Sequence, residues 1–351
     1  MQQMPSGLSA KAVIVGLAAV VVATAVGLFV GPIGIAPHRA MAVLLDSLPL
    51  IEVDSGLSRV HQVIITDLRA PRVMLGLLVG GMLAMSGATF QGAFRNPLAD
   101  PYLLGVAAGA GVGATLAIVG GASDALLPLA AFGGALVAVG CTFLLGSWQS
   151  FRSNFEVSFG QSAATLILAG VAVGSFFAAF QTYIQMREVE SLRNIYSWLL
   201  GRLSTSGWDE VALLAPYALV CGVLLMAFRN HLDVLALGEE EAASLGLRPR
   251  RIRAIVLITA SLAAAAAVAV SGLIGFVGLV VPHGVRLVFG VSNRVVVPLS
   301  FLFGGAFLAL ADVLARTAVS PAEIPIGVVT AFVGAPFFLL ILRRHTAGYA
   351  Y

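Results

Sequence analysis

Long apolar runs separated by short polar segments are the main pattern of this sequence. Nine windows contain no Asp, Glu, Lys or Arg, and about 20 apolar residues in a helix cross the hydrocarbon core of a bilayer. The window 254–285 is long enough for two spans and contains Ser271-Gly272 and Pro282, so we divide it near Gly272. The pattern predicts an all-α polytopic membrane protein with ten transmembrane helices. We place them at roughly residues 12–37, 70–94, 102–121, 125–148, 160–186, 210–228, 252–271, 273–289, 295–315 and 324–343.

The segment between the second and third spans, Arg95–Pro101, is the most informative break in the pattern. It holds two prolines, which end helices, and one charge of each sign. Uncharged runs of membrane-spanning length lie directly before and after it. It is too short for an ordinary solvated linker, so we interpret it as a functional turn inside or at the edge of the membrane.

The composition agrees with a membrane protein. Hydrophobic residues make up 59% and charged residues 11% of the chain, and the mean hydropathy is +0.98, more apolar than any soluble domain needs. The segments between spans are too short for an independent core, so we expect one transmembrane domain over residues 1–351. The net charge of +3 is weak support for nucleic-acid binding, and we expect none. Ala12–His38 exceeds the apolar core of a signal peptide, so we interpret it as a retained first span.

The sequence lacks the residues for ATP chemistry of its own. Lys11 is its only lysine, and Ala10 precedes it where a P-loop needs glycine. Any ATP chemistry, including the binding of ATP and Mg, must therefore come from a partner, and we expect no enzyme activity and no intrinsic cofactor. No metal-ligand spacing and no nucleophile motif is visible, which counts against an intramembrane enzyme. Cys141 and Cys221 lie in apolar runs and are interpreted as small buried hydrophobes.

The distribution of basic residues predicts the orientation. With both termini in the cytoplasm, twelve basic residues lie inside and eight outside, as the positive-inside rule favours. The arginine cluster in Arg248–Arg253 is the strongest single anchor. The inner segment 229–249 has the pattern of two short amphipathic coupling helices, Leu232–Leu237 and Glu239–Leu247, at the membrane surface. A solvated connector is an equal alternative.

The two halves of the chain show a faint internal repeat. In each half a pair of arginines precedes an apolar run, a Ser-Gly pair (Ser86-Gly87 or Ser271-Gly272) and a proline break. The copies begin on opposite faces of the membrane, which predicts two inverted repeats of five helices, a common transporter design. Such a repeat also suits an ion-gradient-driven secondary transporter. That class needs a membrane-embedded carboxylate, and the uncharged windows contain none.

Small residues and charges near span ends are further candidates. Gly105, Gly109 and Gly113 recur every four residues, which favours close helix packing, with a smooth wall along a substrate path as the alternative. Asp312 and Arg316 stand one turn apart at the end of the ninth span, where an interfacial ion pair is the simplest interpretation.

Three arginines suggest an external docking surface. Arg69 and Arg72 are three residues apart and share a helix face, and Arg316 lies on the same side of the membrane. Arginine suits the capture of carboxylates on a partner, because its guanidinium is always charged and binds in a bidentate manner. His283 is interpreted as structural or interfacial, since Arg286 and the cytoplasmic end are close.

A series of motifs in one order resembles the permease subunits of type II ABC importers, which take up ferric siderophores, heme and cobalamin. The resemblance runs from roughly Arg69 to Arg344. Its motifs are Arg69-Ala-Pro-Arg72, Gly87-Ala-Thr-Phe-Gln-Gly92, Phe94-Arg-Asn-Pro-Leu-Ala-Asp-Pro101, Leu104-Gly105, Leu168-Ala-Gly170, Trp198-Leu-Leu-Gly201, Leu237-Gly-Glu-Glu-Glu-Ala-Ala-Ser-Leu-Gly246, Gly275-Phe-Val-Gly-Leu279, Pro282-His283, Ala311-Asp312, Ala315-Arg316, Glu323-Ile-Pro-Ile-Gly327 and Gly334-Ala-Pro-Phe-Phe338.

The resemblance implies a bacterial inner-membrane homodimer with the substrate path along its two-fold axis. A periplasmic binding protein would place its glutamates on Arg69, Arg72 and Arg316, and Asn96 and Leu98 would narrow the path as the cytoplasmic gate. Two ATPase subunits would dock on the inner segment. The residues matched to this coupling role are Glu239, Glu240, Glu241, Ala242, Ala243, Leu245 and Gly246.

The resemblance also implies a second constriction just before the fifth span. At Ala163-Ala164 this chain has alanine where the cobalamin permease has small hydroxyl residues. For the cargo, the general character of Ser191–Gly201 favours heme, with ferric siderophore or cobalamin as alternatives. No histidine, tyrosine or cysteine is assigned as a heme ligand.

Overall fold

The protein is helical throughout the residues that its computed structural model describes, which are 7–46, 53, 55–147, 163–204 and 207–347. No strand occurs among them, so the predicted all-α class is confirmed for this part of the chain. The elements are α1 (Ala10–Phe29), α2 (Pro37–Asp46), α3 (Arg59–Val63), η1 (Ile64–Arg69), α4 (Ala70–Phe94), η2 (Pro101–Leu104), α5 (Val106–Val119), α6 (Leu127–Ser147), α7 (Ala163–Arg187), η3 (Val189–Ser191), α8 (Leu192–Leu199), α9 (Asp209–Leu237), α10 (Glu239–Ser244), α11 (Pro249–Ser271), α12 (Val277–Phe289), α13 (Asn293–Thr317) and α14 (Ile326–Ala347).

Seven helices in the described residues are long and apolar enough to cross a membrane. They begin at Ala10, Arg59, Leu127, Ala164, Asp209, Pro249 and Asn293. The other three predicted spans, 102–121, 273–289 and 324–343, coincide with the shorter apolar helices α5 and α12 and with the first part of α14. The chain is therefore a multi-pass membrane protein.

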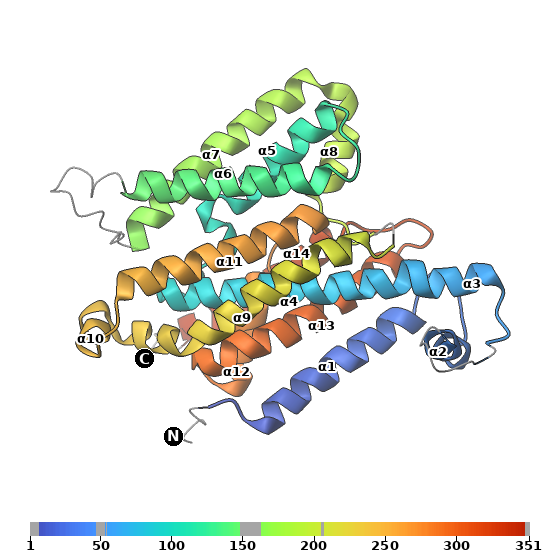
Figure 1. Cartoon of the computed structure of the whole chain (residues 1–351), viewed down its shortest axis with the longest axis horizontal. Coiled ribbons are helices and arrows are strands. Elements are labelled where there is room, and N and C mark those ends of the chain that lie inside the picture. Colours follow the sequence, from blue (N-terminus) through green and yellow to red (C-terminus); the bar gives the residue numbers. More distant parts are fainter. Residues whose placement is uncertain (1–6, 47–52, 54, 148–162, 205–206, 348–351) are drawn as a thin grey trace.

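Helix α4 lies in the middle of the molecule, between α11 and α9 on one side and α13 and α12 on the other (Figure 1). Pairs of small residues allow these close crossings. A Cβ on Gly80 would lie 2.2 Å from the Gly304 carbonyl oxygen, and one on Gly87 would lie 1.9 Å from the Gly278 carbonyl oxygen. The sequence therefore places glycine where two helix backbones touch.

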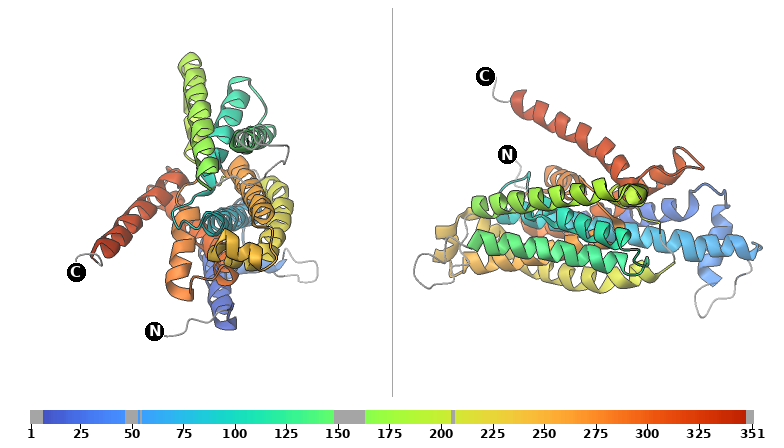
Figure 2. Two further views of the ribbon diagram at one scale, coloured as in Figure 1. Left: turned by 90° about the vertical axis from the view of Figure 1, so that its left-hand side faces the viewer. Right: turned by 90° about the horizontal axis from the view of Figure 1, so that it is seen from above.

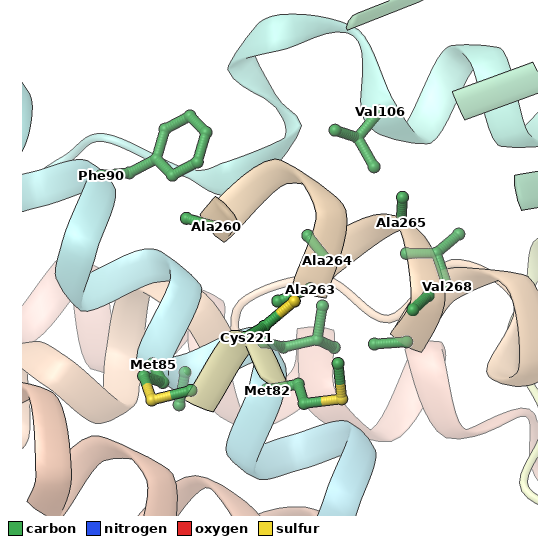
Figure 3. Packing of buried hydrophobic residues seen from close by; sticks show 14 of the residues in the cluster. Met82, Met85, Phe90, Val106, Cys221, Ala260, Ala263, Ala264, Ala265 and Val268 are labelled. Atoms are coloured by element: carbon green, nitrogen blue, oxygen red, sulfur yellow. The ribbon is translucent and has the colours of Figure 1, made fainter. Parts of the chain in front are cut away.

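Helices α5, α6 and α7 form a layer over α11, and α1 packs mainly on α13 and, near its C-terminal end, on α4 (Figure 1). The layer packs on α4 and α11 through small and branched apolar side chains. Between α4, α9 and α11, Cys221 is buried beside Met82, Met85 and Ala263 (Figure 3). Its thiol is free and 1% exposed, so it acts as a small hydrophobe, as its position in an apolar run predicts.

Helix α14 projects from the bundle, with the C-terminus far from the other helices (Figure 2). Several of its apolar side chains are exposed, including Phe332 at 75% and Leu339 at 62%. Helix α7 also presents apolar side chains outward, among them Phe176 at 69% and Met186 at 77%. In a membrane such faces contact lipid or another copy of the chain.

Two segments differ from the sequence-based expectation. Residues 232–237 are not a separate surface helix, because α9 continues unbroken through them to Leu237 and ends only at Gly238. The expectation of two short helices in 229–249 is therefore wrong for the first of them, while α10 forms as the second. At the other end, α3, η1 and α4 form one helix from Arg59 to Phe94, so the second span begins earlier than predicted.

Candidate functional site

The turn after α4 is closed by its own backbone. Arg95 adopts a left-handed φ of 53°, and the N–H of Asn96 donates to the Gln91 carbonyl at 3.1 Å, which caps the last turn of the helix. Asn96 Oδ1 then accepts a hydrogen bond from the Leu98 N–H at 2.9 Å, a local turn typical of asparagine. The Asn96 and Leu98 side chains are exposed, Leu98 at 60%. Both are therefore accessible to a cargo or to another chain.

The far end of the turn is anchored to the loop between α11 and α12. The Asp100 carboxylate accepts a hydrogen bond from the Tyr102 N–H at 2.8 Å and so begins η2. Tyr102 Oη donates to the Ile274 carbonyl at 2.9 Å. Burial raises the pKa of the Asp100 carboxyl to about 6, because its charged form is desolvated. The turn is thus held at both ends.

Helix α10 follows α9 after a single residue, Gly238, whose φ of 142° suits glycine. Ala242 faces inward and is fully buried, while Glu240, Glu241 and Leu245 are exposed, Leu245 at 63%. Ala243 and Gly246 are exposed as well. The short helix therefore presents two free carboxylates and one apolar side chain on its outer surface.

An ion pair fixes α10 to α11. Arg253, 5% exposed, donates to Glu239 with an N–O distance of 2.6 Å. This hydrogen bond is the main reason why the pKa of the Glu239 carboxyl is lowered, and the charges of Arg250 and Arg95 add to the effect. The turn after α4 and α10 lie at the same end of the molecule (Figure 1).

At the opposite end, Arg72 is bound by two carboxylates. Its Nε lies 3.0 Å from both oxygens of Asp312, and its terminal nitrogens lie 3.0 and 2.9 Å from the two oxygens of Glu323. Asp312 also lies 3.5 Å from Arg316, in the i,i+4 arrangement that the sequence predicts. The side-chain exposure is 14% for Arg72 and 3% for Asp312, but 46% for Glu323. Glu323 is therefore the accessible member of this group.

Arg69 and Arg316 are buried, with 4% and 3% exposure. Arg69 donates to the carbonyls of Leu28 and Ile33, and Arg316 donates to the carbonyl of Gly27. These bonds satisfy the carbonyl groups at the end of α1. In this structure the guanidinium groups of Arg69 and Arg316 hold α1 in place, and their role as docking residues stays a prediction.

The three glycines predicted on the third span have different surroundings. Gly105 has a left-handed φ of 83° and joins η2 to α5. A Cβ on Gly109 would lie 2.3 Å from the Gly134 carbonyl oxygen, and one on Gly113 would lie 2.1 Å from the Ala130 carbonyl oxygen. Gly109 and Gly113 therefore pack α5 against α6, the first of the two interpretations from sequence.

Comparison with known proteins gives the family. Residues 19–344 match the FecCD transport family. The chain belongs to this family. Among its relatives, a cobalamin import permease protein, BtuC, of Halobacterium salinarum is 41% identical over 82% of this chain and 75% of its own. An Fe(3+)-citrate import permease protein, YfmD, of Bacillus subtilis is 37% identical over 86% of this chain and 87% of its own.

A solved structure has the same fold as this FecCD permease. It is described as an inward-facing conformation of a metal-chelate type ABC transporter, and it matches with a TM-score of 0.80 and 32% identity over 96% of this chain and all of that chain. The resemblance to type II ABC importer permeases is thus confirmed. FecCD permeases are the membrane components of transporters whose ATPase is a separate subunit.

Sequence reasoning missed two polar contacts of this FecCD permease. Gln91, 3% exposed, donates to the Gly278 carbonyl at 3.0 Å and accepts a hydrogen bond from Arg286, which joins α4 to α12. Asp233 accepts hydrogen bonds from Ser292 Oγ and from the Asn293 N–H, both at 2.6 Å, and so caps α13. The only sequence signal for either contact is a polar residue in an otherwise apolar helix, Gln91 in α4 and Asp233 near the end of α9.

The constriction predicted at Ala163-Ala164 lies partly outside the described side chains. Helix α7 begins at Ala163, whose side chain is not described, and Ala164 is exposed. Among the residues that the structure describes, no group of His, Cys, Asp and Glu is arranged to hold a metal ion.

Proposed function

We propose that the chain is the transmembrane subunit of an ATP-driven importer that carries a bulky metal chelate or corrinoid from a periplasmic binding protein to the cytoplasm. One observation carries the proposal: the anchored turn with the exposed Asn96 and Leu98 lies at the same end of the molecule as α10 (Figure 1). In this arrangement an ATPase that displaces α10 acts next to the exit of the path.

The proposed assembly contains two copies of the chain, two ATPase subunits, which bind ATP and Mg, and one binding protein. The exposed apolar faces of α7 and α14 offer surfaces for a homodimer, in which packing against a second copy replaces contact with lipid. We assign ten spans in two inverted repeats, with both termini in the cytoplasm of a bacterial inner membrane. The binding protein docks at the end that carries Arg72, the most exposed of the three predicted docking arginines.

The proposed cargo is heme, a ferric siderophore or ferric citrate, or cobalamin. Heme rests only on the character of residues 191–201. The names of the relatives support ferric citrate and cobalamin equally. A cavity of about 620 Å³ between α8 and α14 has an apolar lining that includes Leu199, Leu273 and Phe332. It suits a cargo with a large apolar surface.

Uptake into proteoliposomes tests the proposal. The purified chain should hydrolyse no ATP, and with its ATPase and cargo-loaded binding protein it should accumulate heme, ferric citrate or cyanocobalamin only when ATP is present. Hydrolysis should rise when the binding protein is added. Uptake driven by an ion gradient in the absence of the ATPase would instead establish a secondary transporter.

Charge reversal on α10 tests the coupling assignment. Glu240→Lys with Glu241→Lys should lower the affinity for the ATPase by about tenfold, because two positive charges replace the exposed carboxylates that α10 would present to the ATPase. Glu239 is left intact, since it holds Arg253. Affinity is measured with the purified permease in nanodiscs. The control is Glu188→Lys with Glu190→Lys, two exposed glutamates at the opposite end. Equal ATPase affinity in wild type and the α10 variant would remove α10 from the contact.

A further inference from the structure

Two polar cavities meet at Arg202, which follows α8 in the chain. A cavity of about 390 Å³ lies against the end of α5 and the loop after it, and its walls include Asp124, Asn194 and Trp198. A second cavity, of about 210 Å³, lies beside Arg72 and Glu323. Ser197 and Arg202 line both cavities. Arg202 therefore stands at the boundary between them.

The backbone places Arg202 firmly. Its N–H donates to the Ser271 carbonyl at 2.7 Å. Gly201 has a φ of 78°, and a Cβ on Gly272 would lie 2.1 Å from the Trp198 carbonyl oxygen. The segment that carries Arg202 is thus pressed against the end of α11, which limits the positions that its side chain reaches.

The guanidinium group of Arg72 is paired with carboxylates, whereas that of Arg202 has no anionic partner among the described residues. Arg72 is shared by Asp312 and Glu323. Arg202 is exposed and makes no ion pair or side-chain hydrogen bond among the described residues. Asp124 lines the larger cavity but does not form an ion pair with Arg202 at 4.0 Å or less. Asp312 and Glu323 share the smaller cavity with Arg202 but pair with Arg72, so Arg202 has no carboxylate within 4.0 Å among the described residues.

The apolar cavity of about 620 Å³ adjoins this polar region along the chain. Leu199 and Leu200 line the apolar cavity, and Arg202 lines the two polar ones. Leu273 of the loop after α11 lines the apolar cavity, two residues beyond the carbonyl that binds the Arg202 N–H. The cation of Arg202 and the apolar side chains of this cavity are therefore carried by one short segment, Leu199–Arg202.

We propose that Arg202 binds a carboxylate of the cargo at the external mouth of the path, next to the apolar cavity between α8 and α14. The inference rests on the proposed function and specifies its cargo as an anionic chelate. The planar guanidinium offers two parallel N–H groups to one carboxylate, which is the geometry that favours this class of ligand over a neutral one.

Binding of ferric citrate and of cyanocobalamin to the purified chain in nanodiscs tests the inference. Tryptophan fluorescence reports binding, because Trp198 lies in the wall of the larger cavity. Ferric citrate should quench it saturably, and Arg202→Gln should weaken its binding about tenfold or more, the loss expected for a hydrogen bond to a charged group. Arg202→Lys should recover part of the affinity, and Asp124→Asn should increase it. Cyanocobalamin, which has no free carboxylate, should bind wild type and Arg202→Gln equally.

The matched control is Arg193→Gln, an exposed arginine of α8 that lines neither cavity; it should bind ferric citrate as wild type does. Equal affinity of wild type and Arg202→Gln, or no saturable quenching by ferric citrate, would overturn the inference. So would an Arg202→Gln variant that loses affinity only for the cargo-free binding protein, since the carboxylate would then belong to that protein. Failure of ATP-driven uptake with intact ferric citrate binding would reject the proposed function and leave this inference standing.

Discussion

Asp312→Asn should lower the free energy of unfolding of the permease by about 3–5 kcal/mol, the cost of breaking a buried ion pair by removing one partner. Asp312 is 3% exposed and lies against two guanidinium groups, those of Arg72 and Arg316. Asparagine keeps the shape but leaves Arg316 with no carboxylate within 4.0 Å among the described residues. Unfolding is followed by circular dichroism in mixed micelles, with denaturant titrated to completion.

Two further variants separate charge from shape. Glu323→Gln should cost at most about 1 kcal/mol, because Glu323 is 46% exposed and its pair is screened by water. Asp312→Leu combined with Arg316→Met should be more stable than Asp312→Asn, since the unpaired buried charge is gone. If Asp312→Asn costs no more than Glu323→Gln, the pair between Arg72 and Asp312 is not what stabilises this end of the bundle.

Gly87→Leu should destabilise the permease by about 3 kcal/mol or more, at the upper end of what overpacking costs. The added Cβ would lie 1.9 Å from the Gly278 carbonyl oxygen and 2.6 Å from its Cα, both backbone atoms that no rotamer change moves. Helix α12 must therefore shift away from α4. The same denaturant titration measures the loss.

Gly133→Leu is the matched control, because it makes the same change within a helix and so has the same effect on helix propensity and side-chain size, without a close neighbour. Gly133 lies within α6, and a Cβ there would meet nothing within 4 Å. This variant should keep wild-type stability within about 0.5 kcal/mol, as surface substitutions do. Equal stability of the Gly87 and Gly133 variants would mean that the α4–α12 crossing opens without cost.

The helices were predictable because the membrane imposes one strong rule, that a span must be apolar and satisfy its own backbone. Where a helix ends was less predictable. Leu232–Leu237 continue α9 because neither glycine nor proline occurs between Arg229 and Gly238, although Arg229 marks the end of the apolar window. In this segment the charge at Arg229 therefore ends the apolar window, while Gly238 ends the helix.

Side-chain partners far apart in the sequence were the least predictable part of the site. Spacing shows that Arg69 and Arg72 share a helix face, but it does not show that Arg72 meets Asp312, 240 residues away. Nor does it show that Arg69 reaches the carbonyls at the end of α1. An arginine near a span end therefore has two equal interpretations in sequence, and tertiary packing decides between them.

The short junction of α9 and α10, which is the single residue Gly238, has a mechanical consequence. Helix α9 has 29 residues and is about 43 Å long, and its outer end is linked to the second span where Trp208 Nε1 donates to the Thr66 carbonyl. A displacement applied to α10 reaches the opposite face of the membrane along one helix, with Pro216 as a point where it can bend. Both ends of the bundle can therefore move when α10 is displaced, because one helix and not a flexible loop connects them.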